Sequence, residues 1–136
     1  MKILVIDGQG GNIGCRIAKM ITEQIPSADI RLVGTNSIAT ANMMKSGVSA
    51  AATGENAVIV GCRWADVIVG PIGIVIADAL MGEVTPAMAA AVGQSSAVRV
   101  LVPLNKCETL VAGADKLSAS ELLLDAVQKI KLVSEK

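Results

Sequence analysis

Histidine is missing from this 136-residue sequence, and so are phenylalanine and tyrosine. The absence of histidine removes the commonest general acid or base at neutral pH and the commonest metal ligand. It also excludes hydrolases that depend on Ser-His-Asp or Cys-His groups. Trp64 is the only aromatic residue, so a nucleic-acid surface built from stacked aromatic side chains is excluded as well.

Charge and cysteine spacing are also unlike those of nucleic-acid-binding, secreted or zinc proteins. Lys plus Arg and Asp plus Glu each number 12, and this zero net charge argues against binding along a phosphate backbone. Cys15, Cys62 and Cys107 are too scattered for a disulfide framework or a zinc site, which favours a reducing compartment. The longest nearly apolar run, residues 67–77, is shorter than the roughly 20 residues of a membrane span. The N-terminus lacks the pattern of a signal peptide. We therefore expect a cytoplasmic protein that binds neither nucleic acid nor membranes and holds no metal ion.

Hydrophobic residues make up 52% of the chain, and their spacing alternates between that of strands and that of helices. The predicted strands are residues 2–6, 30–33, 48–52, 67–70 and 98–102, with a short sixth at 109–112. The predicted helices are residues 12–24, 37–46, 55–64, 73–82 and 86–93, with a last helix from 118. This alternation indicates parallel βαβ units with right-handed crossovers. We predict a single domain over residues 1–136, an α/β three-layer Rossmann-like sandwich. Its mostly parallel sheet has five to six strands with helices on both faces.

Two of the predicted helices depend on particular local signals in the sequence. Residues 55–64 contain the run Val58–Val60, which favours a strand, but their place between two strands favours a crossover helix, which we predict. Ser118 and Glu121 have the spacing of a capping box at the start of the last helix. The residues expected to face the core are Ile38, Ala41 and Met44 in helix 37–46, and Leu123, Val127 and Ile130 in the last helix.

A glycine-rich loop, residues 7–14 (DGQGGNIG), joins the first strand to the first helix. Glycines let a ligand approach the main chain, and a helix N-terminus offers free N–H groups and the positive end of the helix dipole. Gly11 and Gly14 match the second and third glycines of the dinucleotide fingerprint G-x-G-x-x-G, but Gln9 holds the first position. If the fingerprint is aligned one residue earlier, an isoleucine occupies its third glycine position. The loop thus resembles the fingerprint with a one-residue insertion and predicts a phosphate or carboxylate site. The alternative is a tight turn without a ligand.

Two features differ from an ordinary NAD site. The second strand ends in Gly34-Thr35-Asn36-Ser37, which has no Asp or Glu for the ribose hydroxyls and no Arg for a 2′-phosphate. Asp7 also places a negative charge beside the loop, so a bound phosphate is repelled unless the ligand brings a hydroxyl, an amine or a cation. An NAD(P)-like dinucleotide is therefore one candidate cofactor among several anionic ligands.

Several sequence motifs along the chain together carry a resemblance to a known family. The segments DGQGGNIG, GTNSIAT, ATGENA, GPIGIVIAD, MGEVTP and VPLNKC resemble a family of small bacterial Rossmann-like proteins described as a domain of unknown function. The resemblance covers nearly the whole chain. It implies the Rossmann-like fold and implies no activity.

Polar residues follow each predicted strand at its carboxyl end, where open parallel sheets bind their ligands. Taken alone, each has an ordinary interpretation as a cap, a turn or a solvated side chain. Their convergence on one edge of the sheet predicts a binding site. The candidate ligand-binding residues are Asp7, Gly8, Gln9, Gly10, Gly11, Asn12, Gly14, Thr35, Asn36, Glu55, Asn56, Gly73 and Asn105.

Two classes of function fit these residues. The first is an enzyme that acts on a nucleotide or phosphorylated metabolite, with Asp7, Glu55 or Lys106 handling protons. Cys107 is then either a thiol activated by Lys106 or a passive cysteine. The second is a non-catalytic, oligomeric module that senses a metabolite or has a structural role, which the lack of histidine and the weak ribose-binding signature favour. We predict small-molecule binding and leave catalysis open.

Residues 67–98 carry only two charges, Asp78 and Glu83. The segments 77–80 and 88–92 are apolar on more than one side, whereas a surface helix ordinarily has a charged face. A domain of this size cannot bury all of that surface within itself. We therefore expect a homo-oligomer, most simply a twofold dimer, that associates through residues 73–93.

Overall fold

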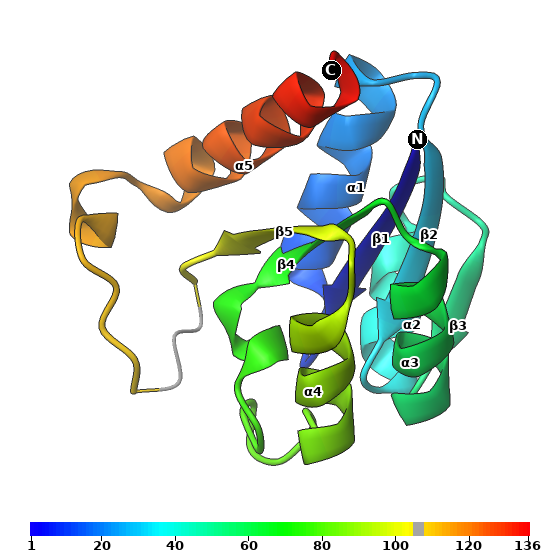
Figure 1. The fold of residues 1–136 in the computed structure, drawn as a ribbon, viewed down its shortest axis with the longest axis vertical. Helices are drawn as coiled ribbons and strands as arrows, with labels where there is room; N and C mark the ends of the chain where they lie inside the picture. Colours follow the sequence, from blue (N-terminus) through cyan, green and yellow to red (C-terminus); the bar gives the residue numbers. More distant parts are fainter. Residues whose placement is uncertain (105–107) are drawn as a thin grey trace.

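The computed structural model describes residues 1–104 and 108–136 and shows an α/β fold around one parallel sheet (Figure 1). The five strands lie in the order β3-β2-β1-β4-β5, and every neighbouring pair is parallel. Their bounds are β1 Lys2–Asp7, β2 Asp29–Gly34, β3 Ala51–Thr53, β4 Val67–Pro71 and β5 Val98–Val102. The predicted Rossmann-like sandwich is confirmed, and the first five strands lie where the sequence predicts them, with β3 displaced toward its carboxyl end.

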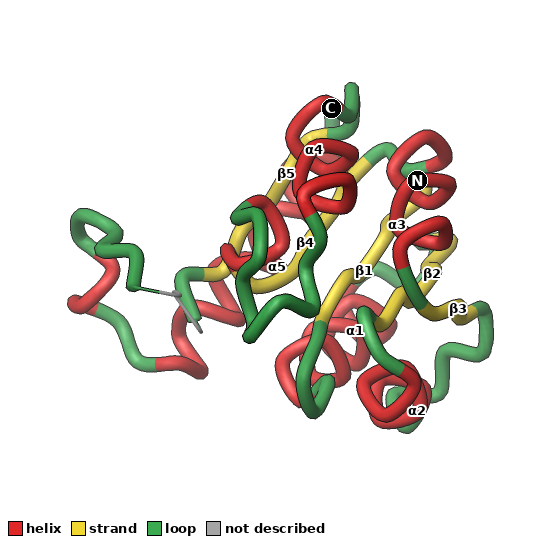
Figure 2. The backbone as a smooth tube through the Cα atoms, turned by 90° about the horizontal axis from the view of Figure 1, so that it is seen from below, coloured by secondary structure: helices red, strands yellow, loops and turns green. Residues whose placement is uncertain are grey.

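The helices cover both faces of the sheet in two separate layers (Figure 2). Helices α1 (Asn12–Gln24), α2 (Ser37–Met44) and α5 (Ala119–Ser134) contribute to the core on one face. Helices α3 (Glu55–Trp64) and α4 (Pro86–Gln94) pack on the other, so the helical choice for residues 55–64 is confirmed. The chain runs outward from β1 through β2 to β3, and then returns to place β4 and β5 on the other side of β1. This reversal makes the carboxyl ends of β1 and β4 the switch point, where such folds bind ligands.

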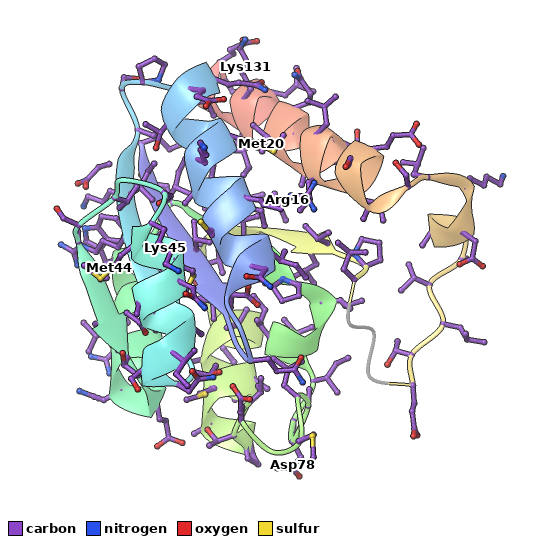
Figure 3. All side chains as sticks on the ribbon, turned by 180° about the vertical axis from the view of Figure 1, so that it is seen from behind. Arg16, Met20, Met44, Lys45, Asp78 and Lys131 are labelled. Atoms are coloured by element: carbon purple, nitrogen blue, oxygen red, sulfur yellow. The ribbon has the colours of Figure 1, made fainter. Side chains whose placement is uncertain are left out.

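The start of α5 forms as its sequence predicts. The Ser118 hydroxyl accepts the Glu121 N–H, and the Glu121 carboxylate accepts the Ser118 N–H, which completes the capping box. Leu123, Val127 and Ile130 are fully buried, as expected. A hydrogen bond also joins the two helices on this face, where the Arg16 guanidinium donates to Ser120; Figure 3 shows Arg16 on the side of α1 that faces α5.

The predicted sixth strand at residues 109–112 is wrong, because that segment is a loop. After β5 the chain turns away from the sheet, and the described connection to α5 extends beyond the sheet edge in Figure 1. A strand needs a neighbour to pair with, and this path offers none. Leu110 within it is 95% exposed.

The predicted buried face of α2 is also wrong. Ile38, Ala41 and Met44 are exposed, and Figure 3 shows Met44 at the outer surface. The buried residues of this helix are Ala39, Thr40 and Met43. Two anchors set this rotation: the Asn36 side chain accepts the Ala39 N–H, and the Thr40 hydroxyl bonds that of Thr53 at 2.7 Å. Close contact with the glycine loop therefore outweighs the simple hydrophobic spacing.

Residues 73–82 do not form the predicted helix. A short 3₁₀ turn, η1 (Ile72–Val75), follows β4 and is succeeded by an irregular segment. Asp78, Leu80 and Met81 have positive φ angles of 65°, 56° and 57°, and Gly82 one of 90°. This left-handed conformation cannot continue a right-handed helix. Instead, the Asp78 N–H donates to the Val84 carbonyl at 2.7 Å and closes a compact 78–84 loop.

Candidate functional site

The glycine loop turns tightly from β1 into α1. The Gly11 N–H donates to the Gly8 carbonyl at 2.9 Å, and Gly11 has a φ of 72°. A Cβ atom on Gly11 would lie 2.4 Å from the Ala39 carbonyl oxygen of α2, and one on Gly14 would lie 2.5 Å from the Met43 sulfur. Gly11 and Gly14 are therefore required for packing α1 against α2 as well as for the turn.

Asp7 is the buried carboxylate of the site, with 2% of its surface exposed. Its Oδ1 accepts the Gly8 N–H at 2.8 Å, and its Oδ2 accepts the Gly14 N–H at 2.7 Å. Burial raises the pKa of Asp7 above its ordinary value and outweighs these two hydrogen bonds, which act to lower it; the negative charge of Glu83 raises it further. The protein thus places one of its own anions against the first turn of α1.

A pocket of about 330 Å³ remains beside this loop and is lined by residues 7–13. The main-chain N–H groups of Gly10, Asn12 and Ile13 have no hydrogen-bond partner among residues 1–104 and 108–136. A Cβ atom on Gly10 would meet nothing nearer than the Asn12 amide nitrogen at 3.6 Å. Three open donors therefore belong to residues that line the pocket.

Glu83 is the residue of the site that the sequence did not identify as a ligand-binding candidate. It extends from the 78–84 loop, and its Oε1 accepts the Gln9 N–H at 2.9 Å, the Thr35 hydroxyl at 2.7 Å and the Asn36 amide at 2.7 Å. Partial burial alone would raise the pKa of Glu83, but the hydrogen bonds from Gln9, Thr35 and Asn36 together hold it below its ordinary value. Glu83 is therefore a stable carboxylate at neutral pH.

Thr35 and Asn36 lie where the sequence placed them, at the carboxyl end of β2. Asn36 caps α2 through its Oδ1, and its amide donates both to Glu83 and to the Gln9 carbonyl. Asn42, which the sequence did not indicate, donates to the Gly10 carbonyl at 2.7 Å. Asn36 and Asn42 thus fix the loop by donating to its carbonyl groups, and they do not occupy the open N–H groups of Gly10, Asn12 and Ile13.

Three further candidates, Glu55, Asn56 and Gly73, are not part of this cluster. Glu55 and Asn56 are exposed at the start of α3, where the Glu55 carboxylate accepts the Thr85 hydroxyl at 2.5 Å. Gly73 is buried in η1. The carboxylate that acts electrostatically on Asp7 is Glu83, and Glu55 is not among the groups that shift the pKa of Asp7. The other candidates, Asn105, Lys106 and Cys107, lie outside the described residues.

The single aromatic residue is also remote from the loop. Trp64 ends α3, and the Arg31 guanidinium covers its ring at 3.9 Å from the ring centre. Because α3 runs antiparallel to the strands as a crossover, its last residue lies at the amino end of the sheet. Trp64 is therefore not placed to stack on a base bound at the glycine loop.

A family model described as "Domain of unknown function (DUF3842)" matches residues 2–135. The chain belongs to this family. The predicted membership of a domain family of unknown function is thereby confirmed over nearly the whole chain. No curated protein and no solved structure matches the chain.

In residues 1–104 and 108–136 of this DUF3842 chain, no group of three or more Cys, Asp or Glu residues is placed to hold a metal ion. None of the described helices is long and apolar enough to cross a membrane.

Proposed function

We propose that this protein binds a small anionic ligand, a nucleotide or another phosphorylated metabolite, at the glycine loop. The observation that carries the proposal is the set of open N–H groups of Gly10, Asn12 and Ile13 on the wall of the 330 Å³ pocket. Three main-chain donors close together in the sequence, at the positive end of a helix dipole, form a favourable environment for phosphate oxygens.

The two neighbouring carboxylates restrict which anion fits. Asp7 and Glu83 both lie against the loop, so a bare anion meets repulsion from each. Asp7 takes up a proton more readily than an exposed aspartate because burial raises its pKa, which lessens the repulsion when an anion binds. Glu83 stays charged, so the favoured ligand combines an anionic group with hydroxyl donors.

Binding without catalysis is the form of this function that the geometry favours. Both oxygens of Asp7 are engaged by main-chain N–H groups, so the buried carboxylate nearest the pocket already has a capping role. Glu55, the other carboxylate considered for proton transfer, is bonded to Thr85 on the rim. This observation supports the metabolite-sensing alternative over an acid/base enzyme.

The test is calorimetric titration with inorganic pyrophosphate. We expect Gly10→Glu to bind at least tenfold more weakly than the wild type, because it adds bulk and negative charge beside the open donors. Ser27→Glu is the control, since Ser27 is exposed between α1 and β2, at the amino end of the sheet and outside residues 73–93. Equal binding by all three proteins would contradict the proposal, and so would a wild type that binds neither pyrophosphate nor nucleotides.

A cytoplasmic location and self-association remain part of the proposal. Cys15 and Cys62 are free thiols, which suits a reducing compartment. Within residues 73–93 the chain buries Leu80 and Val84 itself. Met81 stays 98% exposed, and α4 presents a row of alanines beside a groove of about 690 Å³ shared with α3. This remaining surface supports a homo-oligomer.

A further inference from the structure

The end of β2 carries no acidic residue, yet the structure places a carboxylate there. In dinucleotide-binding folds, an Asp or Glu that follows the second strand accepts the ribose hydroxyls. Here Thr35 and Asn36 occupy that stretch of chain, and both donate to Oε1 of Glu83 at 2.7 Å. The carboxylate missing from β2 is thus supplied by the connection between β4 and α4.

Glu83 is fixed at one oxygen and open at the other. Its Oε1 is held by the two side chains of the β2 end and by the Gln9 N–H of the glycine loop. Its Oε2 accepts no hydrogen bond from the described part of the chain, and the residue is only partly buried. A carboxylate oriented in this way has acceptor capacity left for hydroxyl groups of a ligand.

The 78–84 loop that presents Glu83 is anchored at both sides of the site. Leu80 is buried and lies over the loop, since a Cβ atom on Gly8 would be 2.6 Å from the Leu80 Cδ1. Thr85, directly after the loop, caps α4 and donates to Glu55 of α3. Figure 3 shows Asp78, the first residue of this loop, at the end of the molecule where the strands finish. Glu83 is therefore held beside the glycine loop by packing on several elements.

We infer that Glu83 accepts the two adjacent hydroxyls of a ribose, so that the ligand is a nucleotide with a free 2′,3′-diol whose phosphate lies on the glycine loop. The inference rests on the proposed function and adds the class of ligand. It accounts for a negative charge beside an anion site, because the same ligand presents hydroxyl donors to Glu83 and phosphate oxygens to the N–H groups. A 2′-phosphate in place of the 2′-hydroxyl is excluded by charge repulsion.

The experiment compares three kinds of ligand by calorimetry: pyrophosphate, the nucleotides ADP and UDP, and their 2′-deoxy forms. The wild type is expected to bind ADP or UDP at least tenfold more tightly than the matching deoxynucleotide. In Glu83→Gln this difference is expected to fall below twofold, while pyrophosphate affinity stays the same or rises, because the variant removes a charge that repels a bare anion. The control is Glu23→Gln, which removes an exposed carboxylate near the end of α1. This variant is expected to behave as the wild type.

The outcomes distinguish a failure of the role assigned to Glu83 from a failure of the proposed function. Pyrophosphate binding without discrimination between ribose and deoxyribose overturns the role of Glu83 and leaves the proposed function standing. Tighter nucleotide binding by Glu83→Gln also overturns it, because Glu83 then competes with the ligand. No binding of any of these ligands to the wild type overturns the proposed function itself. The ribose comparison needs only the wild type, so it holds even where a variant folds poorly.

Discussion

Two neighbouring glycines of the same loop are expected to respond to alanine in different ways. In Gly11→Ala the new Cβ atom lies 2.4 Å from the Ala39 carbonyl oxygen and 2.9 Å from the Ala39 Cα, so the backbone of α2 has to move. The φ of 72° adds roughly 1–2 kcal/mol for any residue with a Cβ atom. With about 1–3 kcal/mol for the overlap, the free energy of unfolding should fall by about 3 kcal/mol.

A loss of that size is easily measured. For a chain of this length, about 1 kcal/mol corresponds to a shift in melting temperature of roughly 3.5 °C, so Gly11→Ala should melt about 10 °C lower. Gly10→Ala makes no contact closer than 3.6 Å and should stay within about 2 °C of the wild type. Thermal unfolding followed by circular dichroism checks both variants. Equal melting temperatures for the two would refute the geometry assigned to the loop. The pair also shows why Gly10, and not Gly11, is the position at which to test ligand binding.

Three more measurements address the carboxylates and the assembly. Asp7→Asn turns one acceptor into a donor that faces the N–H of Gly8 or Gly14, so the free energy of unfolding in urea should fall by about 1–3 kcal/mol. An unchanged urea midpoint would contradict the capping role of Asp7. Because the pKa of Glu83 is lowered in the fold, its contribution to stability is present above about pH 4.5 and is lost as the pH falls through the folded pKa. Glu83→Gln should therefore lose less stability than the wild type on acidification, and parallel pH profiles would show that the hydrogen bonds at Oε1 do not form. Light scattering at micromolar concentration should give at least twice the monomer mass of 13.9 kDa, and the monomer mass would contradict self-association through residues 73–93.

The parts of the fold that depend on local pattern could be predicted from the sequence. Buried aliphatic runs give β1 and β4 directly, and Ser118 with Glu121 gives the start of α5, because strand burial and capping act over a few residues. The rotation of α2 could not be predicted in this way. Its exposed Ile38 is more hydrophobic than its buried Ala39, but Gly11 packs directly on the backbone of Ala39, and that contact joins two separate segments of the chain.

The same reasoning explains what was missed at the site. Residues 73–82 have helix-compatible composition, and no local signal indicates that Asp78, Leu80 and Met81 adopt left-handed angles. Such angles persist only where tertiary contacts hold them, and here Leu80 packs on Gly8 while Glu83 bonds to a residue 74 positions earlier. In the sequence, the second strand is followed by no acidic residue, and the apolar stretch contains an isolated glutamate. Nothing in the sequence connects these two features. They become one feature only when the 78–84 loop crosses the ends of the strands and brings Glu83 to Thr35 and Asn36. The lack of an acidic residue after β2 is therefore no evidence against a ribose-binding site, because the 78–84 loop brings the Glu83 carboxylate to that position.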